Sequence, residues 1–384
     1  MPTSPFRFRH HYISRYLPLV RGIGDYGQTA LADLDRDGKL DFVCGRKGPG
    51  EESVLYWFEN RGSEAWGQHL LGHDTRSDVA ACALDVDGDG WVDLVSSGVW
   101  FRNTGRPRQE PFERHVFDPA ASGAHDILAC DIDGDGRDEV LMMGDPTTEL
   151  NGIRWYKVPE DACGPWEWHY VGPPIHGAFC PAGVGDPDGD GDLDIVRGDT
   201  WFENVDGQGR EWRAHPNLPF GQMGAFGMAV RTVVVDLDGD GRPEIVMCEC
   251  DVVGSRVAIL RNVDGKGGEW SRQDLPQSFT YGSLHSLAVA DFTGNGLLDI
   301  LVAEQEELLP PGRENPVLTI YENRGNGDFA EHLVADLGLG WHELQIGDLD
   351  GDGDVDIVSK IWSPAPWNAN GGQMHVDWLE NLAR

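Results

Sequence analysis

Short apolar runs separated by polar, glycine-rich turns make up the whole chain. Runs such as residues 41–44, 194–196 and 299–302 are too short for helices and contain many β-branched or aromatic side chains. In each repeat, one apolar run leads into an acidic turn and a second run follows it. A third run is aromatic, and a Gly-rich turn joins it to a fourth. Four short strands per repeat are typical of a propeller blade.

The third and fourth runs carry their own signatures. In most copies the third run is aromatic and ends in Asn, at Asn60, Asn103, Asn204, Asn323 and Asn381. The fourth has an aromatic residue three positions before a His, as in Trp66/His69, Phe112/His115, Trp166/His169, Trp212/His215 and Phe329/His332. The last repeat stops after its third run. Near the N-terminus, Phe8 lies three positions before His11, which is the spacing of the fourth run. We therefore expect a strand at about residues 6–13 to complete the last blade, so that residues 1–384 form a single all-β domain, a seven-bladed β-propeller of four-stranded antiparallel blades.

The acidic turns have the form D-x-D-x-D-G-x-x-D, as in residues 348–356. Oxygen-bearing side chains occupy positions 1, 3, 5 and 9, and a Gly at position 6 allows the backbone to turn sharply. The turn occurs seven times, beginning at Asp33, Asp85, Asp131, Asp186, Asp236, Asp291 and Asp348. A repeat of this length along the whole chain indicates a propeller or a solenoid.

Converging carboxylates without a cation would repel one another, so we expect a structural Ca²⁺ in each turn, up to seven in all. The expected ligands in the first four turns are Asp33, Asp35, Asp37, Asp41, Asp85, Asp87, Asp89, Asp93, Asp131, Asp133, Asp135, Glu139, Asp186, Asp188, Asp190 and Asp194. Those in the last three are Asp236, Asp238, Asp240, Glu244, Asp291, Thr293, Asn295, Asp299, Asp348, Asp350, Asp352 and Asp356.

These turns and their spacing resemble the FG-GAP/VCBS repeats, a family of calcium-loop propellers that includes the head of the integrin α-subunit. The resemblance covers essentially the whole chain and implies a seven-bladed propeller. It does not imply a function, because one fold serves many functions.

The chain has a formal net charge of −35, which argues against nucleic acid or an anionic membrane as a partner. Its seven cysteines include no C-x-x-C pair, and no apolar run is long enough to cross a membrane. The N-terminal residues lack the apolar core of a secretory signal. The sequence as written thus predicts a cytoplasmic protein, or a secreted one if it is a trimmed mature form.

Seven of the thirteen His residues lie outside the fourth-run signature. His125, His285 and His342 each precede an acidic turn by six residues, at the start of the innermost strand. We expect this end of the central channel, which we call the mouth, to lie opposite the acidic turns. The candidate catalytic residues at the mouth are His125, His285, His342, His176, His73 and Tyr26.

Cationic, amide and aromatic side chains are expected at the same end of the molecule. They come from equivalent inner-strand positions and from the loops that join the second and third strands. The candidate substrate-binding residues are Arg231, Arg197, Lys360, Trp362, Arg46, Lys47, Gln28 and His375. A His cluster also suits a divalent metal such as Zn²⁺, although its ligands would come from different blades.

Proton carriers, cations and an aromatic platform together fit β-elimination from a sugar, in which a base removes a proton next to a carbonyl or carboxylate. Propeller enzymes of similar architecture include ulvan lyases, rhamnose–glucuronate lyases and fungal aldos-2-ulose dehydratase. The sequence therefore favours a carbon–oxygen lyase acting on a uronate-containing oligosaccharide or an oxidised sugar. The alternatives are a non-catalytic propeller that binds a glycan or protein, as in the integrin head, and a hydrolase with a His-held metal.

Overall fold

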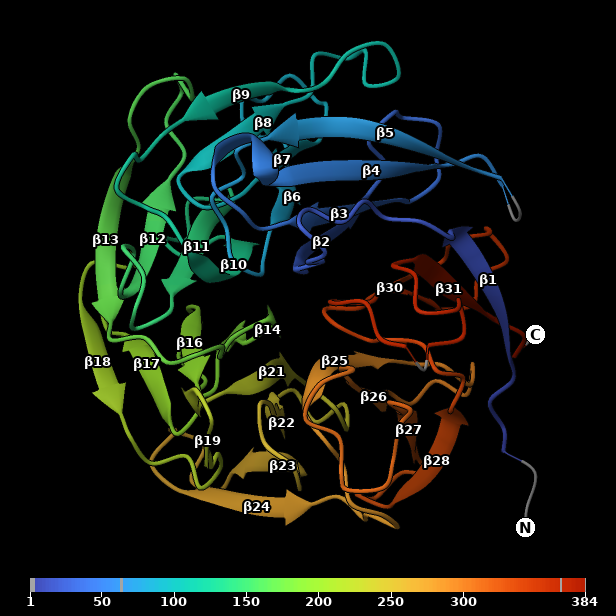
Figure 1. The fold of residues 1–384 in the computed structure, drawn as a ribbon. Coiled ribbons are helices and arrows are strands. Elements are labelled where there is room, and N and C mark those ends of the chain that lie inside the picture. The colour runs from blue at the N-terminus through green and yellow to red at the C-terminus, as the bar shows by residue number, and fades with distance from the viewer. Residues whose placement is uncertain (1–3, 63–64, 367, 384) are drawn as a thin grey trace.

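A computed structural model describes residues 4–62, 65–366 and 368–383, and it shows seven β-sheets arranged as blades around a central channel (Figure 1). Within these residues the helical element is one short 3-10 turn, η1 (Gly50–Glu52). No helix among the described residues is long and apolar enough to span a membrane. The prediction of a seven-bladed all-β propeller is therefore confirmed.

The strands follow one another outward in each blade. Blade one contains β2 (Tyr26–Ala32), β3 (Asp41–Arg46), β4 (Val54–Asn60) and β5 (Trp66–His73). Blade two contains β6 (Cys82–Leu84), β7 (Asp93–Val95), β8 (Val99–Arg102) and β9 (Glu113–Val116). Blade three contains β10 (Ala124–Cys130), β11 (Glu139–Gly144), β12 (Ile153–Lys157) and β13 (Glu167–Gly172). Blade four contains β15 (Val184–Gly185), β16 (Asp194–Arg197), β17 (Thr200–Asn204) and β18 (Trp212–His215).

The remaining blades differ slightly from this plan. Blade five contains β21 (Val230–Val235), β22 (Glu244–Glu249), β23 (Val257–Asn262) and β24 (Trp270–Asp274), and β14 (Pro181–Ala182) joins it as a parallel fifth strand beside β21. Blade six contains β25 (Leu284–Ala290), β26 (Asp299–Glu304), β27 (Leu318–Asn323) and β28 (Phe329–Ala335). Blade seven contains β29 (Gln345–Gly347), β30 (Asp356–Lys360) and β31 (Val376–Asn381). A two-stranded hairpin, β19 (Met223–Gly224) and β20 (Gly227–Met228), precedes blade five.

The N-terminal strand β1 (Phe8–Ser14) closes the ring, as predicted. It pairs antiparallel with β31, with Phe8 opposite Asn381 and His11 opposite Trp378. Figure 1 shows β1 beside β31 on the outer side of blade seven, with the two termini at the same edge of the molecule. Closure leaves no exposed sheet edge between the first and last repeats.

The repeated His residues of the outer strands are packed against the third strands. His69 stacks on Trp57 with ring centroids 4.5 Å apart, and His215 stacks on Trp201 at 4.3 Å. His69 also lies 2.9 Å from Glu59 through its Nε2 atom. Equivalent stacks occur at His11, His115 and His169. The structure thus agrees with a structural role for this set.

In four of the blades the ninth residue of the acidic turn is a buried clamp. In blade one, the two carboxylate oxygens of Asp41 accept hydrogen bonds from the backbone N–H groups of Leu34, at 3.0 Å, and Asn60, at 2.8 Å. Asp93, Asp299 and Asp356 make the same two contacts in their own blades. Each of these carboxylates therefore ties the turn to the end of the third strand.

The Asn at the end of the third strand links neighbouring blades. The Nδ2 atom of Asn103 donates to the backbone oxygen of Leu34, in the acidic turn of the preceding blade, at 2.8 Å. The same inter-blade bond is made by Asn60, Asn204, Asn262 and Asn381. Asn60 reaches Leu349 of blade seven, so this bond also fastens the closure of the ring.

Asn103→Ala should destabilise the protein by about 1–3 kcal/mol, because it leaves the buried backbone oxygens of Leu34 and Val92 without this donor. Denaturant-induced unfolding measures the change. Asn151→Ala, at an exposed position, is the matched control and should shift the free energy of unfolding by no more than about 0.5 kcal/mol. Equal effects of the two substitutions would contradict the inter-blade role of Asn103.

Candidate functional site

A cavity of about 310 Å³ opens at the mouth of the channel. Its lining includes six of the residues predicted for the site: His125, His176, His285, His342, Lys47 and Trp362. The other lining residues are Asp25, Asp78, Val79, Phe226, Asp251, Gln305 and Glu307. The side chains come from several blades that lie far apart in the sequence, and the ring brings them together.

Two of the His residues reach the mouth from β-bulges. The pairing of β10 with β11 shifts register between Ala124 and Asp126, and the pairing of β25 with β26 shifts between Leu284 and Ser286. His125 and His285 are therefore the extra residues of the two bulges. A bulge re-aims a side chain and often lies beside a functional site.

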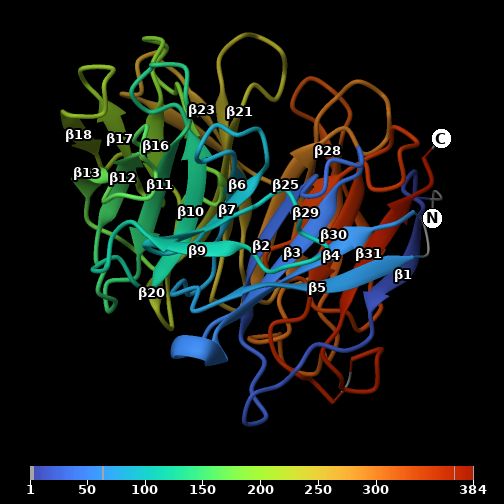
Figure 2. The same ribbon diagram turned by 90° about the horizontal axis from the view of Figure 1, so that it is seen from above.

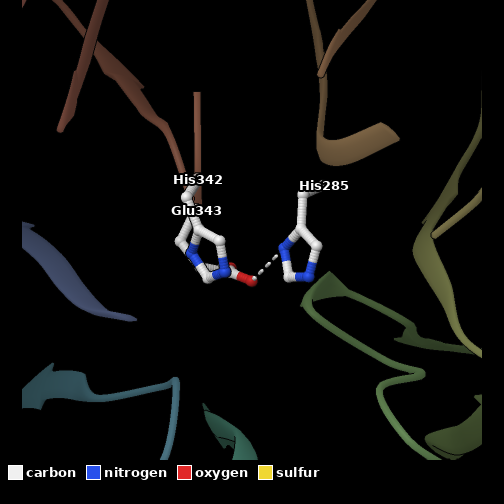
Figure 3. Close-up of side chains that lie close together, drawn as sticks. All are labelled: His285, His342 and Glu343. Atoms are coloured by element: carbon white, nitrogen blue, oxygen red, sulfur yellow. Dashed lines mark ion pairs between the residues drawn. The ribbon is translucent and has the colours of Figure 1, made fainter. Parts of the chain in front are cut away.

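His285 and His342 form a stacked pair in the wall of the cavity. Their ring centroids lie 4.0 Å apart, and Trp362 stacks on the far side of His342 at 4.5 Å. Figure 3 shows the two imidazoles with the Glu343 carboxylate directed towards His285. Both imidazoles are more than nine-tenths buried.

Buried cations lie behind these two rings. Arg231 lies 2.9 Å from Nδ1 of His285, and the ammonium of Lys360 lies 3.1 Å from Nδ1 of His342. Guanidinium and ammonium groups only donate, so each Nδ1 atom accepts these contacts and the hydrogen of each neutral imidazole is on Nε2. Nδ1 of His285 also lies 3.5 Å from the Glu343 carboxylate, which is farther away than the Arg231 donor. Burial lowers the pKa of both His residues, and the nearby cations lower it further, most strongly at His342. Both rings are thus neutral Nε2–H donors at neutral pH.

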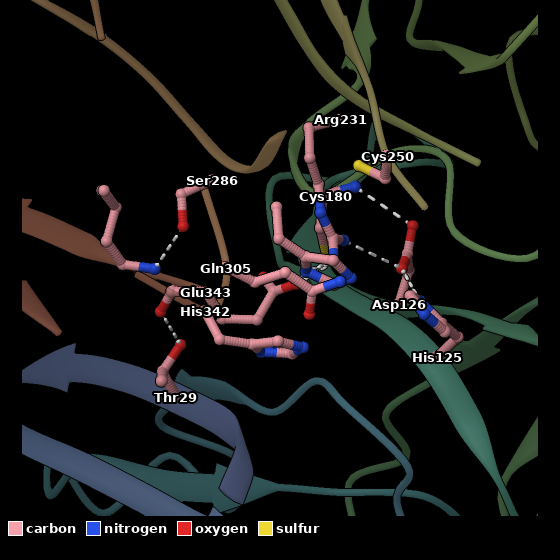
Figure 4. Close-up of polar contacts among 12 residues, drawn as sticks. Thr29, His125, Asp126, Cys180, Arg231, Cys250, Ser286, Gln305, His342 and Glu343 are labelled. Carbon is pink, nitrogen blue, oxygen red and sulfur yellow. Dashed lines mark hydrogen bonds and ion pairs between the residues drawn. The ribbon is translucent and has the colours of Figure 1, made fainter. Parts of the chain in front are cut away.

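Arg231 is the centre of a buried charge network (Figure 4). Its guanidinium pairs with Glu343 and lies 3.6 Å from Asp126. Burial alone would raise the pKa of Glu343, but Arg231 and His285 together outweigh burial and lower it. Glu343 has a left-handed backbone, with φ of 56°, and Thr29 holds its carbonyl oxygen through a hydrogen bond of 2.9 Å. Arg231 is 1% exposed, so it balances two internal carboxylates and is not a clamp facing the solvent.

Two further His residues are paired with carboxylates. Nδ1 of His125 lies 2.7 Å from Asp126, whose second oxygen accepts the N–H groups of Ala178 and Phe179, each at 2.8 Å. Nδ1 of His176 is hydrogen-bonded to Asp145 in the same way. Burial opposes the charged form of His125, but Asp126 outweighs it, and the pKa of His125 is raised. Each carboxylate orients its imidazole through Nδ1, as in a catalytic dyad, and Nε2 of His176 also lies 3.6 Å from Asp251.

Eight of the predicted site residues lie outside the lining of this cavity: Arg231 and Lys360, which lie behind the His pair, and the six described next. His73 is exposed and contacts the backbone of Glu51, and the Tyr26 hydroxyl is buried against the oxygen of Pro18. Gln28 donates to Thr75, Arg46 to the backbone of Glu52, and Arg197 to the backbone of Pro173. His375 is buried beside Asp377.

The placement of these six residues has a common cause. Position along a strand predicts which end of a blade a residue approaches, but it does not predict whether the side chain points into the channel or between blades. Lys360 also lines no part of the cavity, although it contacts it through His342.

Several acidic and amide residues of the site were missed by the sequence reasoning, which assigned nearly all acids to the calcium turns. Asp126 and Glu343 directly follow two of the predicted His residues. Asp145, Asp251 and Gln305 come one or two positions after the second strand of their blades, where Lys47 also lies. Counting from the ends of the second strands would have identified Asp145, Asp251 and Gln305.

The acidic turns fit a cation. In blade four, Asp186, Asp188 and Asp194 bring one oxygen each to within 4.8 Å of one another, and blades one to three have equivalent groups. Burial, together with neighbouring carboxylates, raises the pKa of Asp41 to about 8 and that of Asp194 to about 9. Such shifts mark carboxylates that repel one another without a counter-charge.

The His cluster fits a divalent metal less well. His285, His342 and Glu343 bring possible ligand atoms within 4.8 Å of one another. However, the acceptor nitrogens of both His residues already receive hydrogen bonds from Arg231 and Lys360, and a divalent ion there would lie beside two buried cationic groups. The donor set therefore disfavours an ion at this position, and we derive no chemistry from one.

The fold and its repeated acidic turns define a propeller built from one recurring sequence repeat, and comparison with known families agrees. The model of the FG-GAP-like repeat matches residues 33–96, 85–142, 236–302 and 311–359, more than half of the chain. The chain therefore belongs to the FG-GAP-like repeat family. No curated protein matches the sequence.

Solved structures similar to this chain share only distant sequence likeness. A Photorhabdus luminescens Tc holotoxin pore is 14% identical over 98% of this chain, with a TM-score of 0.41, and the matched region is 14% of that chain. The V. cholerae biofilm matrix protein Bap1 is 13% identical over 93% of this chain and 87% of its own, with a TM-score of 0.48. This chain thus spans only a small part of the first of these proteins.

Arg231→Met should destabilise the protein by about 3–5 kcal/mol, because it leaves Glu343 and Asp126 as buried carboxylates without their cation. Arg213→Met is the matched control, since Arg213 is 58% exposed and its pair with Glu203 should contribute about 0–1 kcal/mol. Denaturant-induced unfolding of both variants measures the difference. A loss at Arg231 no greater than that at Arg213 would rule out the balancing role of Arg231.

Proposed function

We propose that the protein is a carbohydrate-active carbon–oxygen lyase that performs β-elimination in the mouth cavity. The observation that carries the proposal is the division of four His residues in one cavity into two types. His125 and His176 are oriented by carboxylates as proton carriers, whereas His285 and His342 are held neutral as Nε2–H donors. Elimination next to a carbonyl needs both types, a base and a stabiliser of the developing oxyanion.

The proposed roles follow from this division. His125, when neutral, removes the proton α to the carbonyl through Nε2, and Asp126 stabilises the imidazolium that forms. The Nε2–H groups of His285 and His342 donate to the enolate oxygen, as a neutral imidazole does elsewhere when cations or a helix lower its pKa. The β C–O bond then breaks, and protonated His176 gives its proton to the leaving oxygen. The products are an unsaturated sugar and an alcohol, and the proton taken from carbon is returned to solvent.

The charges around the cavity favour an uncharged reacting unit. Four carboxylates line it, from Asp25, Asp78, Asp251 and Glu307. Among the described lining residues, Lys47 is the only lysine or arginine. Lys47 is itself paired with Asp78 at 2.8 Å. Burial, with repulsion from Asp25 and Asp251, raises the pKa of Glu307. A uronate would meet this repulsion, so we propose an oxidised, carbonyl-bearing sugar at the reacting position.

A binding propeller is the second candidate, and the aromatic residues of the cavity favour it. Trp362 and Phe226 both line the space, and Phe226 stacks on His176 with ring centroids 4.9 Å apart. Aromatic faces of this kind hold sugar rings without any reaction. Binding of a sugar with no unsaturated product would select this function over the lyase.

The lyase proposal is tested by incubating the protein with keto-sugars and with glucuronosyl oligosaccharides and recording the ultraviolet absorbance of an unsaturated product. We expect turnover of the keto-sugars. His125→Ala should lower kcat by about 10²–10⁴-fold, the usual contribution of a positioned base. His73→Ala, at an exposed position outside the cavity, should leave kcat unchanged. Full turnover by a variant lacking His125, His285 and His342 together would refute the site.

Asp126→Asn should move the acid limb of the pH–rate profile to lower pH. The negative charge of Asp126 raises the pKa of His125, so its removal lowers that pKa, and the neutral base persists at lower pH. At the same time kcat should fall, because the imidazole is no longer held by a carboxylate. An acid limb that stays in place, or one that moves to higher pH, would exclude His125 as the base.

We further propose that the acidic turns hold structural Ca²⁺, which would relieve the repulsion within each turn. The carboxylates at positions 1, 3 and 5 and the clamp at position 9 supply hard oxygen ligands of the kind Ca²⁺ prefers. In some turns an exposed cation already contacts the carboxylates, such as Arg102 at Asp87 and Asp89. The turn of blade four, at Asp186, Asp188 and Asp190, has no lysine or arginine contact among the described residues and is a clear candidate.

Ca²⁺ should raise the thermal midpoint, and a chelator should lower it, since an ion at 100 times its Kd adds about 2.7 kcal/mol per site. Equilibrium dialysis measures the stoichiometry. Asp186→Asn should reduce it by one ion, whereas Asp328→Asn, an exposed acid outside the turns, should not change it. An unchanged midpoint with and without chelator would show that the turns are stable without calcium.

A further inference from the structure

A second cavity, of about 420 Å³, adjoins the mouth cavity and has no role in the mechanism proposed above. It lies over blades one to three, between the β1–β2 connection, the loop that carries η1 and the loop after β11. Figure 2 shows η1 and the β1–β2 connection projecting from the same side of the ring. We call this cavity the side groove.

The side groove and the mouth cavity share a wall. Asp25, Lys47 and Asp78 line both spaces. At this junction the ammonium of Lys47 lies 2.8 Å from Asp78 and 5.0 Å from the ring centroid of Trp362. The backbone N–H of Lys47 donates to the oxygen of Asp25 at 3.1 Å, which fixes the junction. The two cavities are therefore adjacent, and a ligand that extends past the Lys47–Asp78 pair would contact both.

We propose that the side groove binds the further sugar units of an oligosaccharide whose reacting unit occupies the mouth cavity. This inference rests on the proposed lyase function, which it deepens by assigning the substrate to the class of oligosaccharides and not of free monosaccharides. The two spaces together lie within the range of roughly 300–1,000 Å³ that is typical of ligand sites.

The apolar part of the side groove is preformed. Val20 and Ile23 form a bridge through two backbone hydrogen bonds of 3.2 and 3.0 Å, and between them Arg21 and Gly22 have φ of 56° and 80°. Two consecutive positive φ values define a tight hairpin turn. Ile23 remains 48% exposed, so its side chain offers an apolar surface for the C–H face of a sugar ring.

The polar part of the side groove offers hydrogen bonds to hydroxyl groups. Arg46 is 4% exposed, and its Nε–H has no hydrogen-bond acceptor among the described residues. Glu52 and exposed Arg21 lie at the edge as an ion pair. The Arg21 and Glu52 side chains are 76% and 32% exposed, so a ligand hydroxyl can reach a donor and an acceptor there. Apolar and hydrogen-bonding surfaces side by side suit a sugar, which presents both.

The test compares a 2-keto hexose with a trisaccharide that carries the same 2-keto unit at its reacting end. For the unaltered protein we expect kcat/KM to be at least about tenfold higher for the trisaccharide, a gain equivalent to about 1.4 kcal/mol. Thr148→Trp fills the side groove from the loop after β11, and Ile23→Trp fills it from the hairpin turn. Each should remove the advantage of the trisaccharide and leave the rate with the monosaccharide unchanged.

Val263→Trp is the matched control, since Val263 is 52% exposed and follows β23, away from both cavities. It should preserve the preference for the trisaccharide. Equal kcat/KM for the two substrates, or a preference that survives both groove variants, would overturn the inference while the lyase function stands.

Calorimetric binding of the trisaccharide separates failure of the side groove from failure of the lyase. If neither substrate reacts, the lyase proposal is overturned, and the side groove is then tested only by the affinity of each variant for the trisaccharide. Binding that weakens at least about tenfold in Thr148→Trp and Ile23→Trp, but not in Val263→Trp, supports the groove. Equal binding by all variants overturns it.

Discussion

The buried carboxylate at position nine of each acidic turn is the interaction on which the architecture depends. In blade one, Asp41 accepts the N–H groups of Leu34 and Asn60, and so it joins the turn between the first two strands to the end of the third. The side chain of Asn60 then donates to the turn of the preceding blade. In this blade one carboxylate and one amide therefore hold the turn to the third strand and the blade to its neighbour. A buried carboxylate is stable only with such partners, which explains why the motif is so regular.

This arrangement leaves the opposite end of the ring free to vary. Because the clamps and the inter-blade bonds hold the blades together at the face of the acidic turns, residues at the start of the inner strands and after the second strands can differ between repeats without loss of the fold. His125, Arg231, His285 and Glu343 all come from this variable end, each from a different blade. This division has a simple physical cause. Local hydrogen bonds hold the face of the acidic turns, whereas the residues of the mouth come together only when the ring is closed.

In an anion-binding site cations face the ligand, but in this site the buried cations lie behind the His residues and carboxylates face the cavity. Arg231 is buried against Glu343 and Asp126, and Lys360 lies behind His342. The cations act inward, keeping two imidazoles neutral, while the carboxylates of Asp25, Asp78, Asp251 and Glu307 border the space that a ligand would enter. A residue type expected to grip a substrate thus serves to set the protonation state of its neighbours.

The sequence by itself determined the seven blades, the closure by β1 and the structural role of the outer His residues, because these features rest on contacts within one repeat or on a pairing repeated in every blade. It also located His125, His285 and His342, since their distance from the acidic turns is constant. Only the tertiary structure decided that His176 joins them while His73 and His375 do not, and that Asp126 and Glu343 surround Arg231. These contacts join residues about fifty or more positions apart, and they depend on bulges and side-chain directions across neighbouring blades, which no local pattern of apolar and polar residues encodes.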